Sequence, residues 1–256
     1  MDKIVLITGA TSGIGEACSA LFASRGYKVI ICGRRLARLE KVALNLESTY
    51  NTKVQILCFD VSKKEDVEKS LQLLPAEWKK VDILINSAGL SLGLGPFQNG
   101  EWNDWETMID TNIKGLLYVS KIISNWMIKN KSGHIINLGS IAGKEVIANG
   151  NGYAATKHAV DAITKSMRLD FLEYGIKVTA IHPGSVKTEF SEVRFKGDLE
   201  RAEKVYEGFE PLTALDIAET IWFTATRPKH VTINELIIMP KAQANATMIF
   251  RGTPGF

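Results

Sequence analysis

The stretch Lys3–Gly15 reads KIVLITGATSGIG. Its apolar first half predicts a buried strand, and the glycines at 9, 13 and 15 predict a sharp turn into a helix. A turn without Cβ atoms lets a pyrophosphate approach the helix N-terminus, where free N–H groups and the helix dipole favour anions. The spacing is GxxxGxG rather than the common GxGxxG. We therefore expect a nucleotide site at Gly9, Thr11, Ser12, Gly13, Ile14 and Gly15.

Apolar runs similar to this first strand recur along the chain, with amphipathic segments between them. We expect strands at Lys3–Thr8, Lys28–Cys32, Lys53–Phe59, Asp82–Asn86, His134–Leu138, Lys177–His182 and Glu235–Met239. The runs are continuous rather than alternating, which is typical of strands covered on both faces. Capping boxes at Ser62 with Glu65 and at Thr213 with Asp216 predict two helix starts. The alternation predicts an α/β fold, a Rossmann-type doubly wound parallel sheet of about seven strands with helices on both faces.

This alternation continues without a linker or repeat, so we expect a single domain over residues 1–256. It breaks in two places. At residues 185–209 we expect a lid over a substrate, and in the tail at 240–256 we expect an assembly contact. The two irregular segments are therefore where function beyond the sheet is predicted.

Composition narrows the possible functions. The chain is 45% hydrophobic and 23% charged, and its net charge of +3 predicts no binding of nucleic acid. No run approaches the roughly 18 apolar residues that a membrane span needs. Cys18, Cys32 and Cys58 have no paired spacing, which predicts free thiols and a cytoplasmic location. The four histidines are scattered along the sequence, so we expect no metal site.

The end of the second strand bears on the choice of cofactor. An acidic residue near this point would bind the ribose 2′-OH of NAD, but Gly33 stands there, followed by Arg34 and Arg35. Guanidinium groups can bind a 2′-phosphate through charge-assisted hydrogen bonds, which favours NADP(H). The alternative is that both arginines are solvated and open the next helix, although a helix N-terminus disfavours positive charge.

Further residues are expected around the same cofactor. Asp60, with Val61 beside it, either accepts a hydrogen bond from the adenine amino group or caps the helix that follows. Asn86, Ala88 and Gly89 end the fourth strand with the small side chains that a nearby ribose requires. The nicotinamide pocket is expected at Pro183, Gly184, Val186 and Thr188.

Tyr153 and Lys157 are one helical turn apart in YAATK, so a helix places both side chains on one face. A phenol has a pKa of about 10 and a nearby ammonium lowers it, which makes Tyr153 a candidate general acid and base. Ser140 ends the fifth strand at the edge where open sheets bind ligands, and it would hold the substrate oxygen beside Tyr153. Asn112 lies within a helix, where asparagine costs stability, which indicates a specific role.

In order and spacing, these motifs resemble the short-chain dehydrogenase/reductase superfamily. The motifs are TGATSGIG (8–15), NSAG (86–89), Asn112, Ser140, YxxxK (153–157) and Pro183-Gly184. The resemblance implies a catalytic tetrad of Asn112, Ser140, Tyr153 and Lys157, with Lys157 also bonding the nicotinamide ribose. Ser87 departs from the second asparagine usual in the family, and we expect tolerance there because the segment acts through its backbone.

Longer segments are similar to the NADP-dependent 3-hydroxy acid dehydrogenases, which oxidise serine, allo-threonine and related acids and reduce semialdehydes in reverse. These segments are LPAEW (74–78), DWETMIDTN (104–112), GHIINLGSIAG (133–143), TEFSEVRFKGD (188–198) and IFRG (249–252). The resemblance implies NADP(H), a small acidic hydroxy or aldehyde substrate, and a homotetramer. Met248, Ile249 and Phe250 have no following helix to bury them, so we expect the tail to dock on a neighbouring copy.

Arg194 separates the alternatives for the substrate. A substrate carboxylate favours a bidentate cation near the lid, where Arg194 lies, so we expect substrate contacts at Ser140, Tyr153 and Arg194. If Arg194 is only a surface ion-pair partner, the substrate is an uncharged carbonyl such as a sugar, quinone or steroid. Sulfoacetaldehyde, an acidic aldehyde that related reductases accept, is a further alternative that Arg194 does not separate. A binding module that only senses nucleotides would lack Ser140, Tyr153 or Lys157, and all three are intact.

Overall fold

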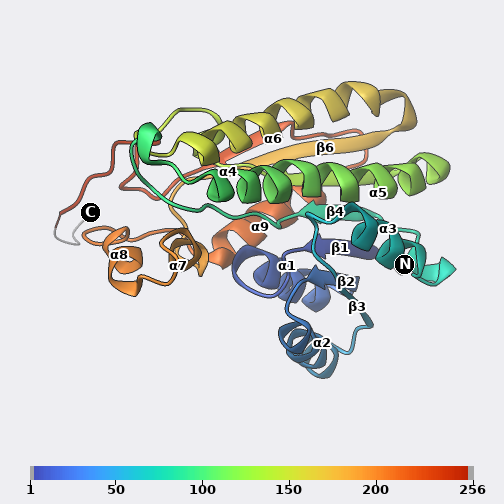
Figure 1. Cartoon of the computed structure of the whole chain (residues 1–256). Coiled ribbons are helices and arrows are strands. Elements are labelled where there is room, and N and C mark those ends of the chain that lie inside the picture. Colours follow the sequence, from blue (N-terminus) through green and yellow to red (C-terminus); the bar gives the residue numbers. More distant parts are fainter. Residues whose placement is uncertain (1–2, 253–256) are drawn as a thin grey trace.

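The computed structural model describes residues 3–252, which form one seven-stranded sheet in the order β3-β2-β1-β4-β5-β6-β7 (Figure 1). The strands are β1 (Ile4–Thr8), β2 (Lys28–Gly33), β3 (Val54–Cys58), β4 (Ile83–Asn86), β5 (Gly133–Leu138), β6 (Ile176–Pro183) and β7 (Glu235–Ile238). All neighbouring strands pair in parallel. The expected doubly wound parallel sheet is confirmed, and each strand end lies within one residue of its predicted position.

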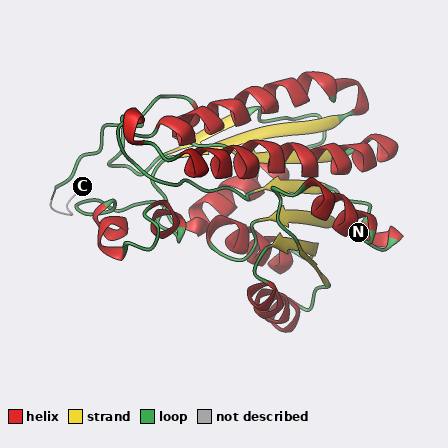
Figure 2. Ribbon diagram, viewed as in Figure 1, coloured by secondary structure: helices red, strands yellow, loops and turns green. Residues whose placement is uncertain are grey.

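Helices cover both faces of this sheet (Figure 2). They are α1 (Gly13–Ser24), α2 (Leu36–Tyr50), α3 (Lys64–Gln72), α4 (Trp102–Ile109), α5 (Leu116–Asn130), α6 (Asn151–Asp170), α7 (Phe190–Arg194), α8 (Leu199–Lys204) and α9 (Ala214–Ala225). One face is covered by α3, α5 and α6, and the other by α1, α2 and α9. No helix within residues 3–252 is long and apolar enough to span a membrane.

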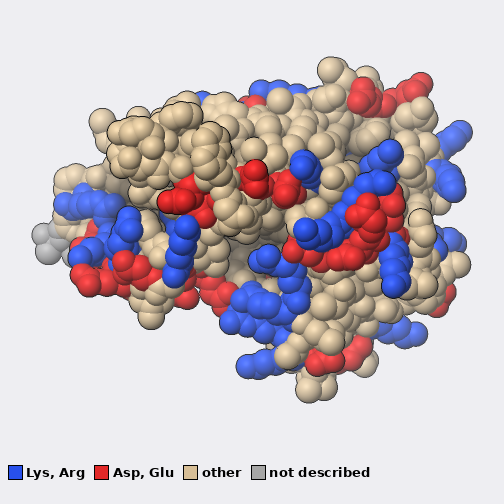
Figure 3. Space-filling view, in the orientation of Figure 1, with Lys and Arg blue, Asp and Glu red and all other residues tan. Residues whose placement is uncertain are grey.

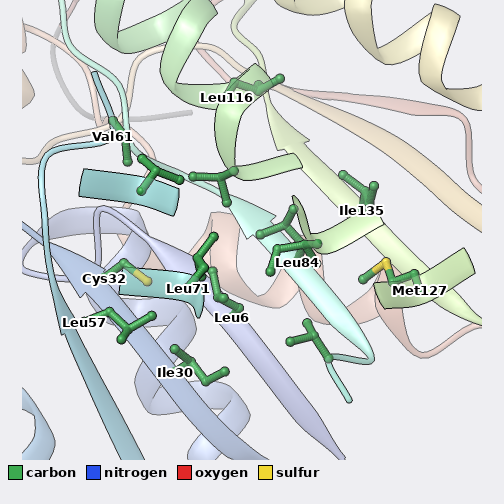
Figure 4. Packing of buried hydrophobic residues seen from close by; sticks show 14 of the residues in the cluster. Leu6, Ile30, Cys32, Leu57, Val61, Leu71, Leu84, Leu116, Met127 and Ile135 are labelled. Carbon is green, nitrogen blue, oxygen red and sulfur yellow. The ribbon is translucent and has the colours of Figure 1, made fainter. Parts of the chain in front are cut away.

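The strands contribute alternate residues to two hydrophobic cores, one on each face. In β1, Ile4 and Leu6 belong to one core, and Val5 and Ile7 belong to the other. Figure 4 shows the first core, where side chains from β1, β2 and β4 meet those of α3 and α5. Because the central strands are buried on both faces, their sequences are mainly apolar, as the continuous runs predicted, and the polar residues among them, such as His134, Asn137 and His182, are buried as well.

The two predicted capping boxes have different outcomes. Thr213 and Asp216 form the complete reciprocal box at the start of α9. The box at Ser62 is wrong, because α3 begins at Lys64 and has no side-chain cap. Asp60 instead accepts hydrogen bonds at Oδ1 from the backbone N–H of Ser62, at 2.9 Å, and from its hydroxyl, at 2.8 Å. A turn closed by Asp60 therefore replaces the predicted cap, so Asp60 does not cap the helix either.

The two irregular segments lie beside each other. Residues 185–209, which we call the lid segment, hold the short helices α7 and α8. The tail returns to the end of this segment, where the backbone N–H of Gly252 donates to the carbonyl oxygen of Gly208 at 3.0 Å. Met248 and Phe250 are 64% and 56% exposed, so the tail presents apolar side chains on the surface.

Candidate active site

The glycine loop after β1 forms one end of the candidate site. Gly9 and Gly13 have φ angles of 68° and 54°, which residues with side chains rarely adopt. A Cβ on Gly15 would lie 2.3 Å from the carbonyl oxygen of Gly9, so this position excludes any side chain. α1 begins at Gly13 without a side-chain cap, which leaves its first N–H groups available to an anion. The loop thus has the backbone form that a pyrophosphate requires.

A cavity of about 310 Å³ extends from this loop past the carboxyl ends of the strands to α7. It therefore brings together the glycine loop, the two arginines and the Tyr–Lys pair, which are far apart in the sequence. Glu189 and Phe190 of the lid segment also contribute to its wall. The predicted site residues that do not line the cavity are Gly15, Asn86, Asn112 and Arg194.

Asn86 lies behind the cavity wall. Its amide nitrogen donates to Ser120 Oγ and to Asn137 Oδ1, each at 2.8 Å. The side chain is buried and ties β4 to β5 and α5, so any contact of Asn86 with a ribose would be made by its backbone. The small residues that follow it, Ala88 and Gly89, do line the cavity.

Asn112 lies in a π-helical turn, Asp110–Gly115, between α4 and α5. Its Oδ1 accepts from the backbone N–H of Leu90 at 2.9 Å, and its Nδ2 donates to the Leu90 carbonyl at 2.8 Å. Nδ2 also donates to Thr156 Oγ1 at 3.0 Å. The amide therefore holds the loop after β4 against α6, the helix that carries Tyr153. Its side chain supports the site and does not face the cavity.

The arginines after β2 lie beside the glycine loop. Arg35 donates to Thr11 Oγ1 through Nε at 3.2 Å and through Nη2 at 2.8 Å, and also to Ser12 Oγ at 3.0 Å. Arg34 has a largely exposed side chain and pairs with Asp60 at 3.7 Å. Figure 3 shows Lys and Arg side chains gathered over α2, across a hollow from α7 and α8. Guanidinium groups that could bind a 2′-phosphate thus stand at this end of the cavity.

An acidic residue of the lid segment meets these arginines. Glu189 accepts from Arg35 Nη1 at 3.0 Å and from Arg38 Nη1 at 2.6 Å. Burial raises the pKa of Glu189, but the hydrogen bonds and charges of the two arginines outweigh it and lower the pKa overall. The sequence pattern did not predict Glu189 or Arg38, because the contact joins residues 151 positions apart with no motif between them.

Tyr153 and Lys157 are both buried on α6 and both line the cavity, as their spacing predicted. Lys157 Nζ donates to the Leu138 carbonyl at 2.8 Å and lies 5.9 Å from the centroid of the Tyr153 ring. Burial lowers the pKa of Lys157 to about 8. Burial also raises the pKa of Tyr153, and the charge that opposes this rise is that of Arg194. This corrects the expectation that Lys157 supplies that charge.

Ser140 is held at the cavity by groups on both sides. Its hydroxyl accepts from the backbone N–H of Ala142 at 3.1 Å, and its hydrogen bond with Tyr153 lowers the pKa of the phenol. Behind it, the buried His182 on β6 donates from Nδ1 to the Ser140 carbonyl at 3.2 Å. Because a carbonyl oxygen only accepts, this contact fixes the tautomer of a neutral imidazole. Sequence reasoning treated His182 as an isolated residue and missed this role.

A cluster of charged groups surrounds His182. Asp161, His182 and Glu235 offer ligand atoms within 4.8 Å of one another, a grouping that the scattered sequence positions did not reveal. The ammonium of Lys144 lies 2.8 Å from Asp161 Oδ1 and 2.6 Å from Glu235 Oε2. A lysine therefore already stands where a metal ion would bind the two carboxylates.

Arg194, at the end of α7, lies behind the cavity wall and against the catalytic candidates. Its guanidinium carbon is 5.3 Å from the centroid of the Tyr153 ring and 5.0 Å from that of Phe190. Its Nε donates to Ser91 Oγ at 3.1 Å. Burial lowers the pKa of Arg194, and within residues 3–252 no carboxylate forms an ion pair with it. The guanidinium is thus buried against two aromatic rings with no carboxylate paired to it among the described residues.

Comparisons with known proteins agree with this geometry. The family model for short chain dehydrogenases matches residues 3–198. The NADP-dependent 3-hydroxy acid dehydrogenase of Escherichia coli is 45% identical over 244 residues, which are 95% of this chain and 97% of that protein. Serine 3-dehydrogenase of Agrobacterium fabrum is 41% identical over 246 residues, which are 96% of this chain and 97% of that protein.

Solved structures give the same result. The closed form of a serine dehydrogenase complexed with NADP⁺ superposes with a TM-score of 0.91 at 45% identity, covering 95% of this chain and 97% of that one. Serine dehydrogenase from Escherichia coli has a TM-score of 0.80 at 39% identity, covering 94% and 99%. The likeness thus extends over nearly the whole chain, including the lid segment.

Proposed function

The chain belongs to the short chain dehydrogenase family, and we propose that it is an NADP-dependent oxidoreductase that interconverts a small 3-hydroxy acid and its oxo or semialdehyde form. The observation that carries this proposal is one cavity with a glycine loop at one end and Ser140, Tyr153 and Lys157 at the other. Relatives named for NADP and 3-hydroxy acids or serine, which match nearly the whole chain, support the choice of cofactor and substrate class.

The residues present fit NADP(H). The glycine loop and the uncapped start of α1 would hold the pyrophosphate, and Arg34 and Arg35 would hold the 2′-phosphate. Val61, Ala88 and Gly89 would border the adenosine and ribose groups. The nicotinamide, when bound, supplies or accepts a hydride. Its pocket would be formed by Pro183, Gly184, Val186 and Thr188.

The proton is handled by α6 and the turn after β5. Tyr153 donates its hydroxyl proton to the substrate oxygen during reduction and takes it back during oxidation. Ser140 hydrogen bonds with that phenol and orients the same substrate oxygen. Lys157 lies one helical turn away, where its ammonium would bond the nicotinamide ribose, and the charge of Arg194 would stabilise the phenolate. Asn112 supports both groups through Thr156 on the same helix.

Arg194 favours an acidic substrate over an uncharged carbonyl. A carboxylate beside Tyr153 would satisfy the buried guanidinium, whose charge has no acidic partner among the described residues. Only Nε is used by Ser91, so the other N–H groups can donate to the substrate. Sugar, quinone and steroid carbonyls would leave this cation unpaired at a considerable desolvation cost.

We also propose that the enzyme is a cytoplasmic homotetramer. The free thiols of Cys18, Cys32 and Cys58 support the location. The exposed apolar side chains of Met248 and Phe250 support docking of the tail on a neighbouring copy. Light scattering at micromolar concentration tests the assembly, and a monomer would contradict it.

The function is tested with 3-hydroxy acids, including serine and allo-threonine, each paired with the neutral alcohol of the same skeleton. Formation of NADPH is followed by absorbance, and every substrate is repeated with NAD⁺. We expect the acids to be turned over with NADP⁺ and the neutral alcohols to react at least about tenfold more slowly. Equal rates for acids and neutral alcohols, or equal use of NAD⁺, would contradict the proposal.

A further inference from the structure

Ser140 and Tyr153 act on the same substrate oxygen in the proposed reaction, but they come from different elements. Ser140 precedes the 3-10 turn η4 (Ile141–Gly143), and Tyr153 lies on α6. The chain between them includes Asn149, which has a positive φ angle of 63°. The distance between Ser140 and Tyr153 depends on how η4 is held against α6 on one side. It also depends on how η4 is held against β6, which lies behind Ser140.

Lys144 follows η4 directly and ties it to two other elements. Its ammonium lies between Asp161, which is on α6 two turns after Tyr153, and Glu235, which begins β7. The side chains of Lys144 and Asp161 are only 17% and 13% exposed, so this contact is largely shielded from water. Burial lowers the pKa of Lys144, but hydrogen bonds to both carboxylates outweigh it and raise the pKa overall.

The other side of Ser140 is fixed by close contact with β6. The imidazole of His182 is fully buried and holds the Ser140 carbonyl. A Cβ on Gly139 would lie 2.5 Å from His182 Nδ1, so the chain before Ser140 lies directly against that ring. His182 Nε2 is 3.5 Å from Asp161 Oδ1, the oxygen that also accepts from Lys144. With its proton on Nδ1, His182 does not donate from Nε2 to Asp161, so the imidazole holds the back of Ser140 and the ion pair of Lys144 with Asp161 separately holds the end of η4 to α6.

We propose that Lys144 is a positioning residue for proton transfer: through Asp161 and Glu235 it fixes the turn that carries Ser140 against the helix that carries Tyr153. The inference rests on the proposed function, because it assigns the proton to Tyr153. Without the ammonium, two carboxylates would face each other with no cation between them, and their repulsion would separate α6 from β7. Ser140 would then lose its alignment with the phenol.

Lys165 offers a matched control. It binds the same carboxylate, at 2.7 Å from Asp161 Oδ2, but from the exposed side of α6 and without contact to η4. Lys144→Met should lower kcat about tenfold, since small misplacements of reacting groups have effects of this order or larger. Lys165→Met should stay within about twofold of wild type. Lys144→Arg should restore most of the rate, because a guanidinium can bridge two carboxylates.

A second measurement does not depend on turnover. With tyrosine labelled by carbon-13 at Cζ, the Tyr153 signal is identified by its loss in Tyr153→Phe and titrated with pH. Ser140 lowers the pKa of Tyr153, so Lys144→Met should move this titration to higher pH, and Lys165→Met should leave it in place. If Lys144→Met does not fold, Glu235→Gln removes one of the two contacts and is expected to shift the titration in the same direction.

The two proposals fail in different ways. If wild type turns over no hydroxy acid but the titration shift is present, the proposed function is wrong and the positioning by Lys144 stands. If wild type is active and Lys144→Met matches Lys165→Met in both kcat and titration, the positioning is wrong. A lowered kcat with an unmoved Tyr153 titration would also overturn it, because it would indicate a general loss of structure.

Discussion

At the cofactor end of the cavity the wall is largely backbone, whereas at the lid end it is made by side chains on short helices. The backbone N–H of Ala10 donates to the Cys32 carbonyl at 3.0 Å. Thr8 Oγ1 accepts from the backbone N–H groups of Ser87 and Ala88. In the lid segment, the hydroxyl of Tyr206 lies 2.7 Å from that of Ser191. This side-chain contact joins α7 to the residues that follow α8.

This difference shows which parts of a site a sequence reveals. A phosphate cradle made of backbone needs glycines at fixed positions, and those positions are visible as a motif. A substrate pocket made of side chains depends on contacts across the fold, such as the hydrogen bond between Arg194 and Ser91, which are 103 positions apart in the sequence. Substitutions at the two ends should therefore differ in kind, with losses of binding and fold at one end and losses of selectivity at the other.

The largest effect is expected where the two ends meet. Tyr153→Phe removes the proposed proton donor, and kcat should fall by about 10²–10⁴ because general acid–base catalysis contributes that much. NADPH binding, measured by its fluorescence, should remain within about threefold of wild type. A variant that keeps more than about a tenth of the wild-type kcat would exclude Tyr153 as the acid.

At the cofactor end, Gly15→Ala should break the cradle itself. The added Cβ would collide with the Gly9 carbonyl, and overpacking of this kind costs about 1–3 kcal/mol of unfolding free energy. NADPH affinity should fall at least about tenfold, because the loop must move. Gly95→Ala is the control, since a Cβ there meets nothing within 4 Å. Similar denaturation midpoints for the two variants would contradict this account.

At the lid end, Arg194→Met should change selectivity. A charged hydrogen bond contributes about 1.5–3 kcal/mol, so kcat/KM for acidic substrates should fall roughly 10- to 100-fold. The neutral alcohol of the same skeleton should lose little. Parallel losses for both would mean that Arg194 supports the lid and does not bind the substrate.

The same variant should alter the pH dependence. The charge of Arg194 lowers the pKa of Tyr153, so its removal disfavours the phenolate and raises that pKa. The rate of alcohol oxidation, which needs the phenolate, should then rise at a higher pH than in wild type. The neutral alcohol is the substrate of choice for this profile, because its binding does not involve the missing charge. An unmoved profile would show that Arg194 does not influence the phenol.

The smallest effect is expected from Arg34→Ala. The Arg34 side chain is 62% exposed, so its contact with a 2′-phosphate is weakened by water and salt. NADP⁺ affinity should fall about tenfold, and NAD⁺ affinity should change by less than about twofold. Equal losses for both cofactors, measured by calorimetry, would contradict the assignment.

The sequence predicted the sheet, the glycine loop and the Tyr–Lys pair because each depends on residues that are close together in the chain. It did not predict the contacts of residues whose partners are distant in the sequence. The bond of the Asn86 amide to Asn137 on the next strand was not predicted, because nothing local in the sequence indicates that partner. Lys157 was expected to act on Tyr153, but burial and Arg194 dominate the pKa of that phenol, and neither is visible in the spacing YxxxK.

The bridge from Glu189 to Arg35 and Arg38 has a consequence for how salt affects the enzyme. Three arginines at this end of the cavity suggest strong attraction for a phosphate, but Asp60 and Glu189 already neutralise part of that charge. Binding of a 2′-phosphate is therefore partly an exchange of counter-ions, in which an internal carboxylate gives up contacts to an incoming anion. Added salt weakens the displaced pairs and the new ones alike, so cofactor affinity should depend less steeply on ionic strength than three unpaired arginines would dictate.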